Sequence, residues 1–389
     1  MLSLETRRAV AELAKAVQDV GPLAHALVPP LHVAPADRRG LQQVLDRVTK
    51  RLRVPSMRLT NRKNLTPFDR VVSARLALER LAGPLTASAV DEDTDAFDAT
   101  VDSALALDFD SFCERATVHA ADGTVLPGYA AGDPGARGVV LASACGMPAR
   151  LAEVWMRRLA VHHRVVTWES RGLFADTDMD TGAGYGATDV TTQVGDLFSV
   201  MDHFGLREAH VIGLCGGAVL AVRAAGAQPE RVTSLSLWHG DFELGEHAPK
   251  TSHQRNLQAF MAMAAENRVS ASSVHAVLRQ SMLGAVPPDL AHLVLYPYAT
   301  PELLFRYCQL NGALMGADVA SQLPRVTQPA LVVTSEDDDT AHPDGSRYVA
   351  AALPDARLVV ADSGDHLALF RSGNSMLDLA ARFITQGEP

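Results

Sequence analysis

The chain has 389 residues, of which 47% are hydrophobic and 21% are charged, a composition typical of a folded protein with room for two or three domains. Its 35 basic and 45 acidic residues give a formal net charge of −10, which argues against general nucleic-acid binding. Four cysteines without a CxxC spacing exclude a disulfide scaffold and fit a reducing compartment. With no signal-like start and no long apolar run, the sequence predicts a soluble, cytoplasmic protein that does not enter a membrane.

The first part of the chain has the pattern of helices. Apolar residues recur at helical spacing over residues 10–20 and again over residues 41–52. Thr66, Pro67 and Asp69 have the order of an N-cap, a first-turn proline and a capping-box acid, which predicts the start of a third helix that ends by Gly83-Pro84. We therefore expect residues 1–110 to form an all-helical N-terminal domain.

The charge of this segment is uneven. Residues 1–80 contain 15 Lys and Arg residues and 7 Asp and Glu residues, an excess of eight positive charges. An acidic run then begins at Asp91-Glu92-Asp93 and continues to Asp108, as expected of a solvated helix or linker. The run marks a domain boundary near residue 110.

Beyond residue 110, short apolar strands alternate with amphipathic helices. A hairpin is predicted over residues 116–129, with its turn at Asp122-Gly123-Thr124. Further strands are expected at 138–142, 164–168, 209–213, 232–238, 329–334 and 356–360, and helices at 155–161, 190–204, 217–227, 344–353 and 375–383. This alternation is typical of an α/β protein whose parallel sheet carries helices on both faces.

The alternation stops over residues 241–324. Helical patterns at 256–265, 272–282 and 301–314 follow one another there without a convincing strand. We expect this segment to be a helical lid inserted into an α/β core formed by residues 111–240 and 325–389.

One strand runs directly into an apolar helix through Gly213-Leu214-Cys215-Gly216-Gly217. A strand-to-helix turn this tight needs very small neighbours, because it holds its central residue in a strained conformation at the tip of the sheet. The side chain of Cys215 should then lie at the amino end of the helix, where the helix dipole favours a thiolate. A cysteine after a strand is otherwise more often a small buried hydrophobic residue, so its role depends on what lies near it.

Two later strands also end in polar residues. The strand at 329–334 is followed by Ser335-Glu336-Asp337-Asp338-Asp339, and the strand at 356–360 by a loop that contains His366. The carboxyl ends of parallel strands are where catalytic groups collect, and the order is nucleophile, acid, histidine. Three consecutive aspartates leave open whether Asp337, Asp338 or Asp339 is the acid.

With these three motifs in this order, residues 112–386 resemble the α/β-hydrolase superfamily. The resemblance implies an eight-stranded, mostly parallel sheet with a helical lid between the sixth and seventh strands. It also implies that Cys215 is the nucleophile, His366 the base, and Asp338 the acid that orients His366. The N-terminal helices are an extension that the superfamily does not require.

The resemblance further implies an oxyanion hole made by the backbone amides of Gly216 and Met147. Cys145 stands two residues before Met147, where histidine is common in the superfamily, and is more simply explained by packing. The candidates for substrate contact are Cys145, Glu169, His239 and Asp241. The spacings of Cys and His fit no zinc site and no phosphate loop follows a strand, so neither a metal nor a cofactor is expected.

A cysteine at this elbow favours acyl transfer. A thiolate attacks without losing a proton in the transition state, and the thioester that it forms keeps the acyl group activated. We expect an acyltransferase, cyclase or thioesterase that acts on an acyl thioester or ester. The alternatives are a lyase that performs elimination or C–C cleavage with His366 and Asp338 as base, and a non-catalytic binding protein.

The basic N-terminal segment predicts how substrate arrives. Many acyl thioesters are presented by small acidic carrier proteins, which a basic surface would attract. This hypothesis assigns the attraction to Arg51, Arg53, Arg58 and Arg62. The alternatives are an ordinary solvated helix face and a homodimer contact.

Overall fold

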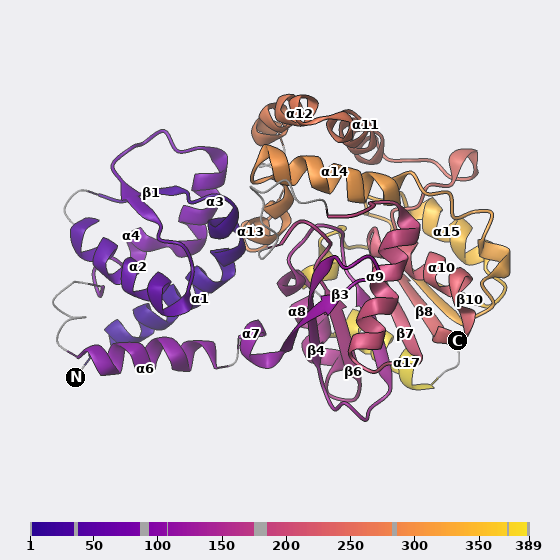
Figure 1. The fold of residues 1–389 in the computed structure, drawn as a ribbon, viewed down its shortest axis with the longest axis horizontal. Coiled ribbons are helices and arrows are strands. Elements are labelled where there is room, and N and C mark those ends of the chain that lie inside the picture. Colours follow the sequence, from indigo (N-terminus) through magenta and orange to yellow (C-terminus); the bar gives the residue numbers. More distant parts are fainter. Residues whose placement is uncertain are drawn as a thin grey trace. The chain divides into compact units, whose positions relative to one another are not determined.

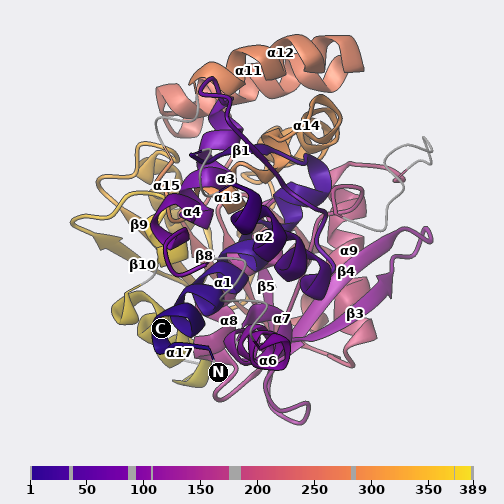
Figure 2. The same cartoon turned by 90° about the vertical axis from the view of Figure 1, so that its left-hand side faces the viewer.

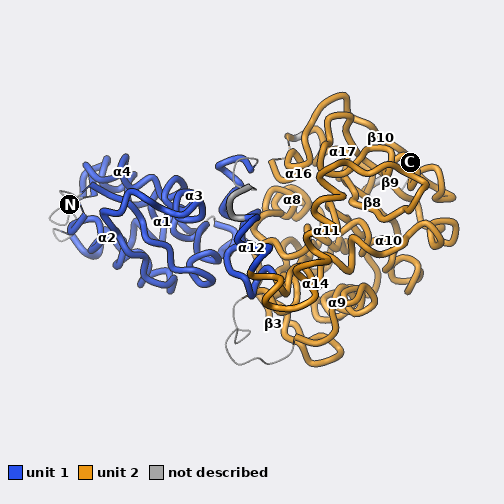
Figure 3. Tube along the Cα trace, turned by 90° about the horizontal axis from the view of Figure 1, so that it is seen from above, with its two compact units in different colours: residues 1–112, 273–304 blue, residues 113–272, 305–389 orange. Residues whose placement is uncertain are grey.

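The computed structural model describes residues 2–34, 38–85, 93–106, 108–174, 185–281, 286–371 and 373–386. They form two compact units, one of residues 1–112 with 273–304 and the other of residues 113–272 with 305–389 (Figure 3). Among the helices that these residues form, none is long and apolar enough to cross a membrane.

An eight-stranded sheet forms the centre of the second unit, with strand order β10-β9-β8-β7-β5-β6-β4-β3 (Figure 1). Its strands are β3 (Glu114–His119), β4 (Val125–Ala131), β5 (Gly138–Ala142), β6 (Arg164–Trp168), β7 (Ala209–Leu214), β8 (Val232–Trp238), β9 (Ala330–Ser335) and β10 (Ala356–Ala361). β4 is antiparallel to both β3 and β6, and every other pair in the sheet is parallel. The mostly parallel sheet and the hairpin are therefore confirmed.

Helices cover both faces of this sheet, because every residue of β5, β7 and β9 is buried and needs apolar cover on either side. α9 and α10 lie on one face and α8 and α17 on the other (Figure 3). The helices that follow strands are α8 (Glu153–Leu159), α9 (Val190–His203), α10 (Gly217–Ala227), α15 (Pro343–Ala352), α16 (Ala368–Arg371) and α17 (Asn374–Gln386).

The segment between β8 and β9 is helical, as expected. It contains α11 (Ser252–Glu266), α12 (Arg268–Ser281), α13 (Ala291–Val294) and α14 (Pro301–Met315). Met282, where the predicted second helix ends, lies outside the described residues. The two compact units divide this segment, since residues 273–304 group with the N-terminal part of the chain.

The first unit is built around α1 (Leu4–Ala26), which packs against α2 (Arg38–Leu52), α3 (Pro67–Leu76), α4 (Leu78–Leu81) and α6 (Thr94–Leu105), and also against α13 (Figures 1 and 2). α7 (Phe109–Phe112) ends this part of the chain. The Thr66–Asp69 capping box opens α3 as predicted, but a left-handed residue, Ala77 at φ 48°, breaks the third helix into two.

An all-helical N-terminal domain is not what the structure contains. Two three-residue strands, β1 (Pro30–His32) and β2 (Arg58–Thr60), pair in parallel within the first unit. Each strand is too short for periodicity to distinguish it from loop, and the parallel pairing depends on residues 28 positions apart in sequence.

The acidic run balances the basic charge of the first unit. Residues 81–112 contain eight acidic residues and no Lys or Arg, so residues 1–112 carry no net charge. Asp98 of α6 pairs with Arg47 at 2.9 Å, and Asp102 pairs with Arg51. Asp91 and Glu92 lie outside the described residues.

Candidate active site

Four neighbouring strands of the sheet, β7, β8, β9 and β10, run parallel and end at the same edge. Cys215 follows β7, His239 follows β8, Asp338 follows β9 and His366 follows β10. Side chains far apart in sequence therefore meet at one edge of the sheet, as the strand order requires.

The turn from β7 into α10 has the geometry of a nucleophile elbow. Cys215 adopts φ 55°, a left-handed conformation that is rare for a residue with a side chain. A Cβ added at Gly213 would lie 2.4 Å from the Cα of Ala218, and one at Gly217 would lie 2.0 Å from the carbonyl oxygen of Ala142. Glycine is thus required on both sides of Cys215, which remains partly exposed.

Asp338 lies next to His366 and is fully buried. Its Oδ2 accepts a hydrogen bond from Nδ1 of His366 at 3.0 Å, and its Oδ1 accepts from the amides of Thr340 and Ala341 at 3.0 and 2.9 Å. The two flanking aspartates, Asp337 and Asp339, are exposed. Of the three acids that the sequence left open, it is Asp338 that contacts the histidine.

Charges in the site favour an ionised acid and a protonated histidine. Burial acts to raise the pKa of Asp338, but hydrogen bonds from His239 and His366 outweigh it and hold that pKa well below its usual value. Burial acts to lower the pKa of His366, but Cys215 and Asp338 together raise it well above its usual value.

The position of the proton on His366 follows from these charges. An ionised carboxylate can only accept hydrogen bonds, so Nδ1 of His366 carries a hydrogen. Nε2 is buried and meets no hydrogen-bond partner at full geometry among the described residues, but Cys215 lies close enough to raise the pKa of the ring. Nε2 is therefore the nitrogen that carries the second hydrogen of the imidazolium, on the side of the ring where Cys215 favours the charged form.

The two amides expected to form the oxyanion hole differ in their surroundings. Among the described residues, no acceptor is found for the amide of Gly216. The amide of Met147 donates to the carbonyl oxygen of Ala144 across 3.3 Å, a long hydrogen bond within a turn. The amide of Gly216 is thus free to donate to a ligand. The amide of Met147 would first have to give up its long hydrogen bond to Ala144.

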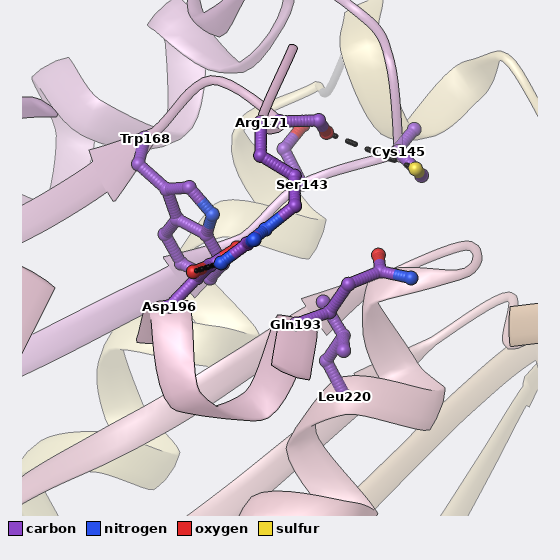
Figure 4. A pocket seen from close by; sticks show the side chains of 9 residues that line it. Ser143, Cys145, Trp168, Arg171, Gln193, Asp196 and Leu220 are labelled. Atoms are coloured by element: carbon purple, nitrogen blue, oxygen red, sulfur yellow. Dashed lines mark hydrogen bonds and ion pairs between the residues drawn. The ribbon is translucent and has the colours of Figure 1, made fainter. Parts of the chain in front are cut away.

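Cys145 lines a small polar cavity behind this turn (Figure 4). The cavity has a volume of about 20 Å³, room for one water molecule, and Arg171 and Asp196 form a buried ion pair beside it. The hydroxyl of Ser170 lies 3.7 Å from Sγ of Cys145, and burial raises the pKa of this thiol to about 12. These surroundings fit a structural role for Cys145 better than a catalytic one.

The other candidates for substrate contact have protein partners. Oε1 of the buried Glu169 accepts a hydrogen bond from the amide of Ala149 at 3.2 Å. Oδ1 of Asp241 accepts one from the side chain of Gln254 at 2.6 Å, and burial raises the pKa of Asp241. His239 donates to Asp338 from a position that is only 1% exposed.

Sequence reasoning missed two polar side chains of the helical insertion. Gln254 binds Asp241 and also accepts the amide of His342 at 3.0 Å, so it ties the start of α11 to the loops after β8 and β9. The amide nitrogen of Asn311, on α14, donates to the sulfur of Met261 at 3.3 Å, and its oxygen lies against Gly216. The available signal for Asn311 was a polar residue in an apolar helix, and for Gln254 it was the capping-box spacing after Thr251.

A larger cavity of about 440 Å³ lies between α11 and α14. Its lining is mostly apolar and small: Thr188, Gln258, Met261, Ala262, Ala265, Cys308, Gln309, Gly312, Ala313 and Gly316. Met261 belongs to this lining and also holds Asn311, which lies against the residue after Cys215. The volume is within the range of small-molecule sites.

His239, Asp338 and His366 have their ligand atoms within 4.8 Å of one another, a spacing that could hold a metal ion. Both ring nitrogens donate to the same carboxylate oxygen, at 2.7 and 3.0 Å. Two N–H donors on one ionised oxygen account for this spacing, so we interpret the group as hydrogen-bonded.

Comparison with known proteins agrees with this fold. A family model described as alpha/beta hydrolase fold matches residues 146–372, from the turn after β5 to beyond His366. The chain belongs to the alpha/beta hydrolase fold family. This membership identifies the general class, a hydrolase-type enzyme, and the N-terminal unit falls largely outside the match.

Curated relatives of similar sequence are the proteins named putative carbamate hydrolase RutD. The one from Azorhizobium caulinodans is 24% identical over 253 residues, which is 61% of this chain and 86% of the relative. The one from Klebsiella pneumoniae is 26% identical over 238 residues, which is 60% of this chain and 85% of the relative.

Solved structures share the fold at low sequence identity. The enol-lactonase from Burkholderia xenovorans LB400 has a TM-score of 0.53 and 20% identity, covering 70% of this chain and all of that one. The 2-hydroxy-6-oxo-6-phenylhexa-2,4-dienoate hydrolase from Rhodococcus sp. strain RHA1 has a TM-score of 0.51 and 19% identity, covering 69% and 98%. At this level the likeness concerns the fold alone.

Proposed function

We propose that this α/β-hydrolase is a cysteine-dependent acyl-transfer enzyme that acts on acyl thioesters or esters. The observation that carries the proposal is the placement of Cys215 at the left-handed tip of the elbow, beside a histidine held by a buried, ionised aspartate. A merely structural cysteine has no need of this strain or of a histidine whose pKa it raises.

In the first half-reaction, the thiol of Cys215 first gives its proton to Nε2 of His366, and the resulting thiolate attacks the carbonyl carbon of the substrate. Asp338 holds the ring and stabilises the imidazolium that results. The amides of Gly216 and Met147 bind the oxyanion. The tetrahedral intermediate then expels the thiol or alcohol of the substrate, which takes the proton from His366, and the acyl group stays on Cys215.

In the second half-reaction, an acceptor attacks the acyl-cysteine. Nε2 of His366 removes the proton of water, an alcohol or an amine as it adds to the thioester carbon, and Cys215 leaves as a thiolate that recovers the proton. Hydrolysis and transfer therefore differ only in the acceptor. Because a thioester remains activated, the cysteine suits either outcome.

The cavity between α11 and α14 is the place for the acyl group. Its lining of Ala, Gly, Met and Cys side chains suits hydrocarbon, with the polar groups of Thr188, Gln258 and Gln309 among them. The contacts of Asn311 with Met261, in the lining, and with Gly216, next to Cys215, support this assignment. The names of the relatives, carbamate hydrolases and an enol-lactonase, also denote substrates with a carbonyl carbon joined to a leaving group.

The test is intact-mass spectrometry of the protein mixed with N-acetylcysteamine thioesters of increasing acyl length. We expect the mass to rise by one acyl group in the wild type and in Cys113→Ala, a matched control for a buried thiol outside the cavity. The adduct should be absent in Cys215→Ala. An adduct that persists in Cys215→Ala would contradict the proposal, and turnover by that variant would favour the lyase reaction that uses His366 and Asp338 alone.

Delivery by an acidic carrier protein is part of this proposal. Arg51 forms an ion pair with Asp102, which partly neutralises its charge toward a partner protein. Arg53, Arg58 and Arg62 are exposed and have no ion pair among the described residues. Lys63 is exposed beside them. These four cations, between the end of α2 and the segment after β2, would attract an acidic partner even though residues 1–112 have no net charge.

A further inference from the structure

His239 is a buried histidine that the proposed reaction does not use. It follows β8 in the sequence Trp238-His239-Gly240 and adopts φ 47°, a left-handed conformation. Its amide donates to the carbonyl oxygen of Val333 at 2.8 Å, which fixes the backbone next to β9. Only 1% of its side chain is exposed.

The ring of His239 points at the acid of the catalytic group. Its Nδ1 lies 2.7 Å from Oδ2 of Asp338, the same oxygen that His366 contacts at 3.0 Å. The two rings stand almost perpendicular, with centroids 5.8 Å apart. The ionised carboxylate can only accept, so both Nδ1 atoms carry hydrogens.

These contacts use every acceptor site of Asp338. A carboxylate offers about four lone-pair sites, and here each oxygen accepts two N–H groups: Thr340 and Ala341 on Oδ1, and His239 and His366 on Oδ2. The carboxylate cannot rotate without losing several hydrogen bonds at once. The electron density of Oδ2 is also divided between two donors, which limits how strongly it holds the imidazolium of His366.

We propose that His239 is a positioning residue that shares Oδ2 of Asp338 with His366, and so fixes the orientation of the carboxylate and moderates the basicity of His366. The role as part of an enzyme rests on the proposed acyl-transfer function, whereas the effect on His366 does not. His239 touches the acid and acts through it.

Other charged groups lie near the ring of His366 and also affect its protonation, so a test must leave them unchanged. Around His366 these are Cys215, Asp338, Asp241 and His253, and around His253 they include Asp339. Substitutions at His239 leave all of them in place. A comparison between two replacements of His239, one with and one without an N–H donor, therefore isolates the shared hydrogen bond.

The experiment follows the ring signals of ¹⁵N-labelled histidine by NMR against pH, with His366 assigned from His366→Gln. His239→Leu removes the donor, and the pH midpoint of His366 should rise by about one unit, since the carboxylate is left to a single imidazole. His239→Asn keeps an N–H at the δ position and tolerates the left-handed backbone, so the midpoint should stay within about 0.3 unit of wild type.

A matched control is His210→Leu, because His210 is also fully buried but binds Ser234 and Ser236 on β8. This variant should leave the midpoint of His366 unchanged. A midpoint that does not move in His239→Leu, or that moves as far in His239→Asn, overturns the proposal. The wild-type protein provides a second test, which does not depend on a variant folding. A hydrogen on Nε2 of His239 in place of Nδ1 would also overturn the proposal.

The outcome separates this inference from the proposed function. If the midpoint shifts as stated but no acyl adduct forms on Cys215, the acyl-transfer proposal fails and the role of His239 stands. If the adduct forms but replacement of His239 does not move the midpoint of His366, the acyl-transfer proposal stands and the proposed role of His239 fails.

Discussion

Replacement of Asp338 by Asn tests the catalytic geometry with little change of shape. The asparagine oxygen can still accept the amides of Thr340 and Ala341, which leaves its NH₂ group facing the two histidine Nδ1 atoms. Those atoms must then become acceptors, so His366 shifts its hydrogen to Nε2. A ring protonated at Nε2 cannot take a proton from Cys215.

The expected loss of acylation rate is large, because the substitution changes the tautomer of His366 as well as removing a contact. In a serine protease, replacement of the triad aspartate by asparagine lowers kcat by about 10⁴. A thiol needs less help from its base than a hydroxyl does, so we expect acylation of Cys215 to slow by roughly 10² to 10⁴. The fold should survive, because all four partners of residue 338 keep a hydrogen bond.

The assay is the rate of acyl-adduct formation on Cys215, followed by intact mass, together with the rate of iodoacetamide alkylation, which needs no substrate. Asp337→Asn and Asp339→Asn are matched controls, since both side chains are exposed. Each should stay within about twofold of wild type, in keeping with surface substitutions. The reasoning is refuted if Asp338→Asn acylates within about threefold of wild type while folded, or if a neighbouring aspartate has the larger effect.

Three further outcomes are expected. Gly217→Ala places a Cβ 2.0 Å from a carbonyl oxygen and should cost about 2–4 kcal/mol in denaturant unfolding, whereas Gly226→Ala, in the same helix with its nearest atom at 3.5 Å, should cost nothing or stabilise. The pKa of His366 is raised in the folded state, so its protonation stabilises the fold fully below about pH 6.5. This stabilisation is lost as the pH rises through the folded pKa. The melting temperature of wild type should therefore fall relative to that of His366→Gln between pH 6 and pH 9. Reversal of charge at Arg53, Arg58 and Arg62 should raise KM for an acyl chain on an acidic carrier protein and leave KM for a small thioester unchanged, and equal values for both substrates would count against the carrier.

Local patterns were enough to predict the strands of the central sheet. The strand at 138–142 is a run of apolar residues and the strand at 232–238 is rich in apolar residues, and both predictions match the structure to the residue. The elbow could be predicted because glycine at 213 and 217 is required by sterics that do not depend on distant residues. Asp338 could be placed only to within one residue, since three acids follow one strand and burial selects among them.

Features that depend on distant partners were not predictable. β1 and β2 have three residues each, and neither has a pattern that marks it as a strand. The insertion after β8 has the pattern of one helical segment, but residues 273–304 group with the N-terminal helices because α13 packs on α1 and α3. His239 was expected to contact substrate, and only the tertiary structure shows its ring on Asp338.

The shared carboxylate and the proposed thiol nucleophile are suited to one another. A serine hydroxyl must lose its proton to the base as it attacks, so a serine enzyme gains from an acid that binds the imidazolium strongly. Here Oδ2 of Asp338 serves two imidazoles, which weakens its hold on each. A thiol tolerates that weaker support, because sulfur gives up its proton readily and remains a strong nucleophile. A second donor on the acid therefore limits this site less with cysteine at position 215 than it would with serine.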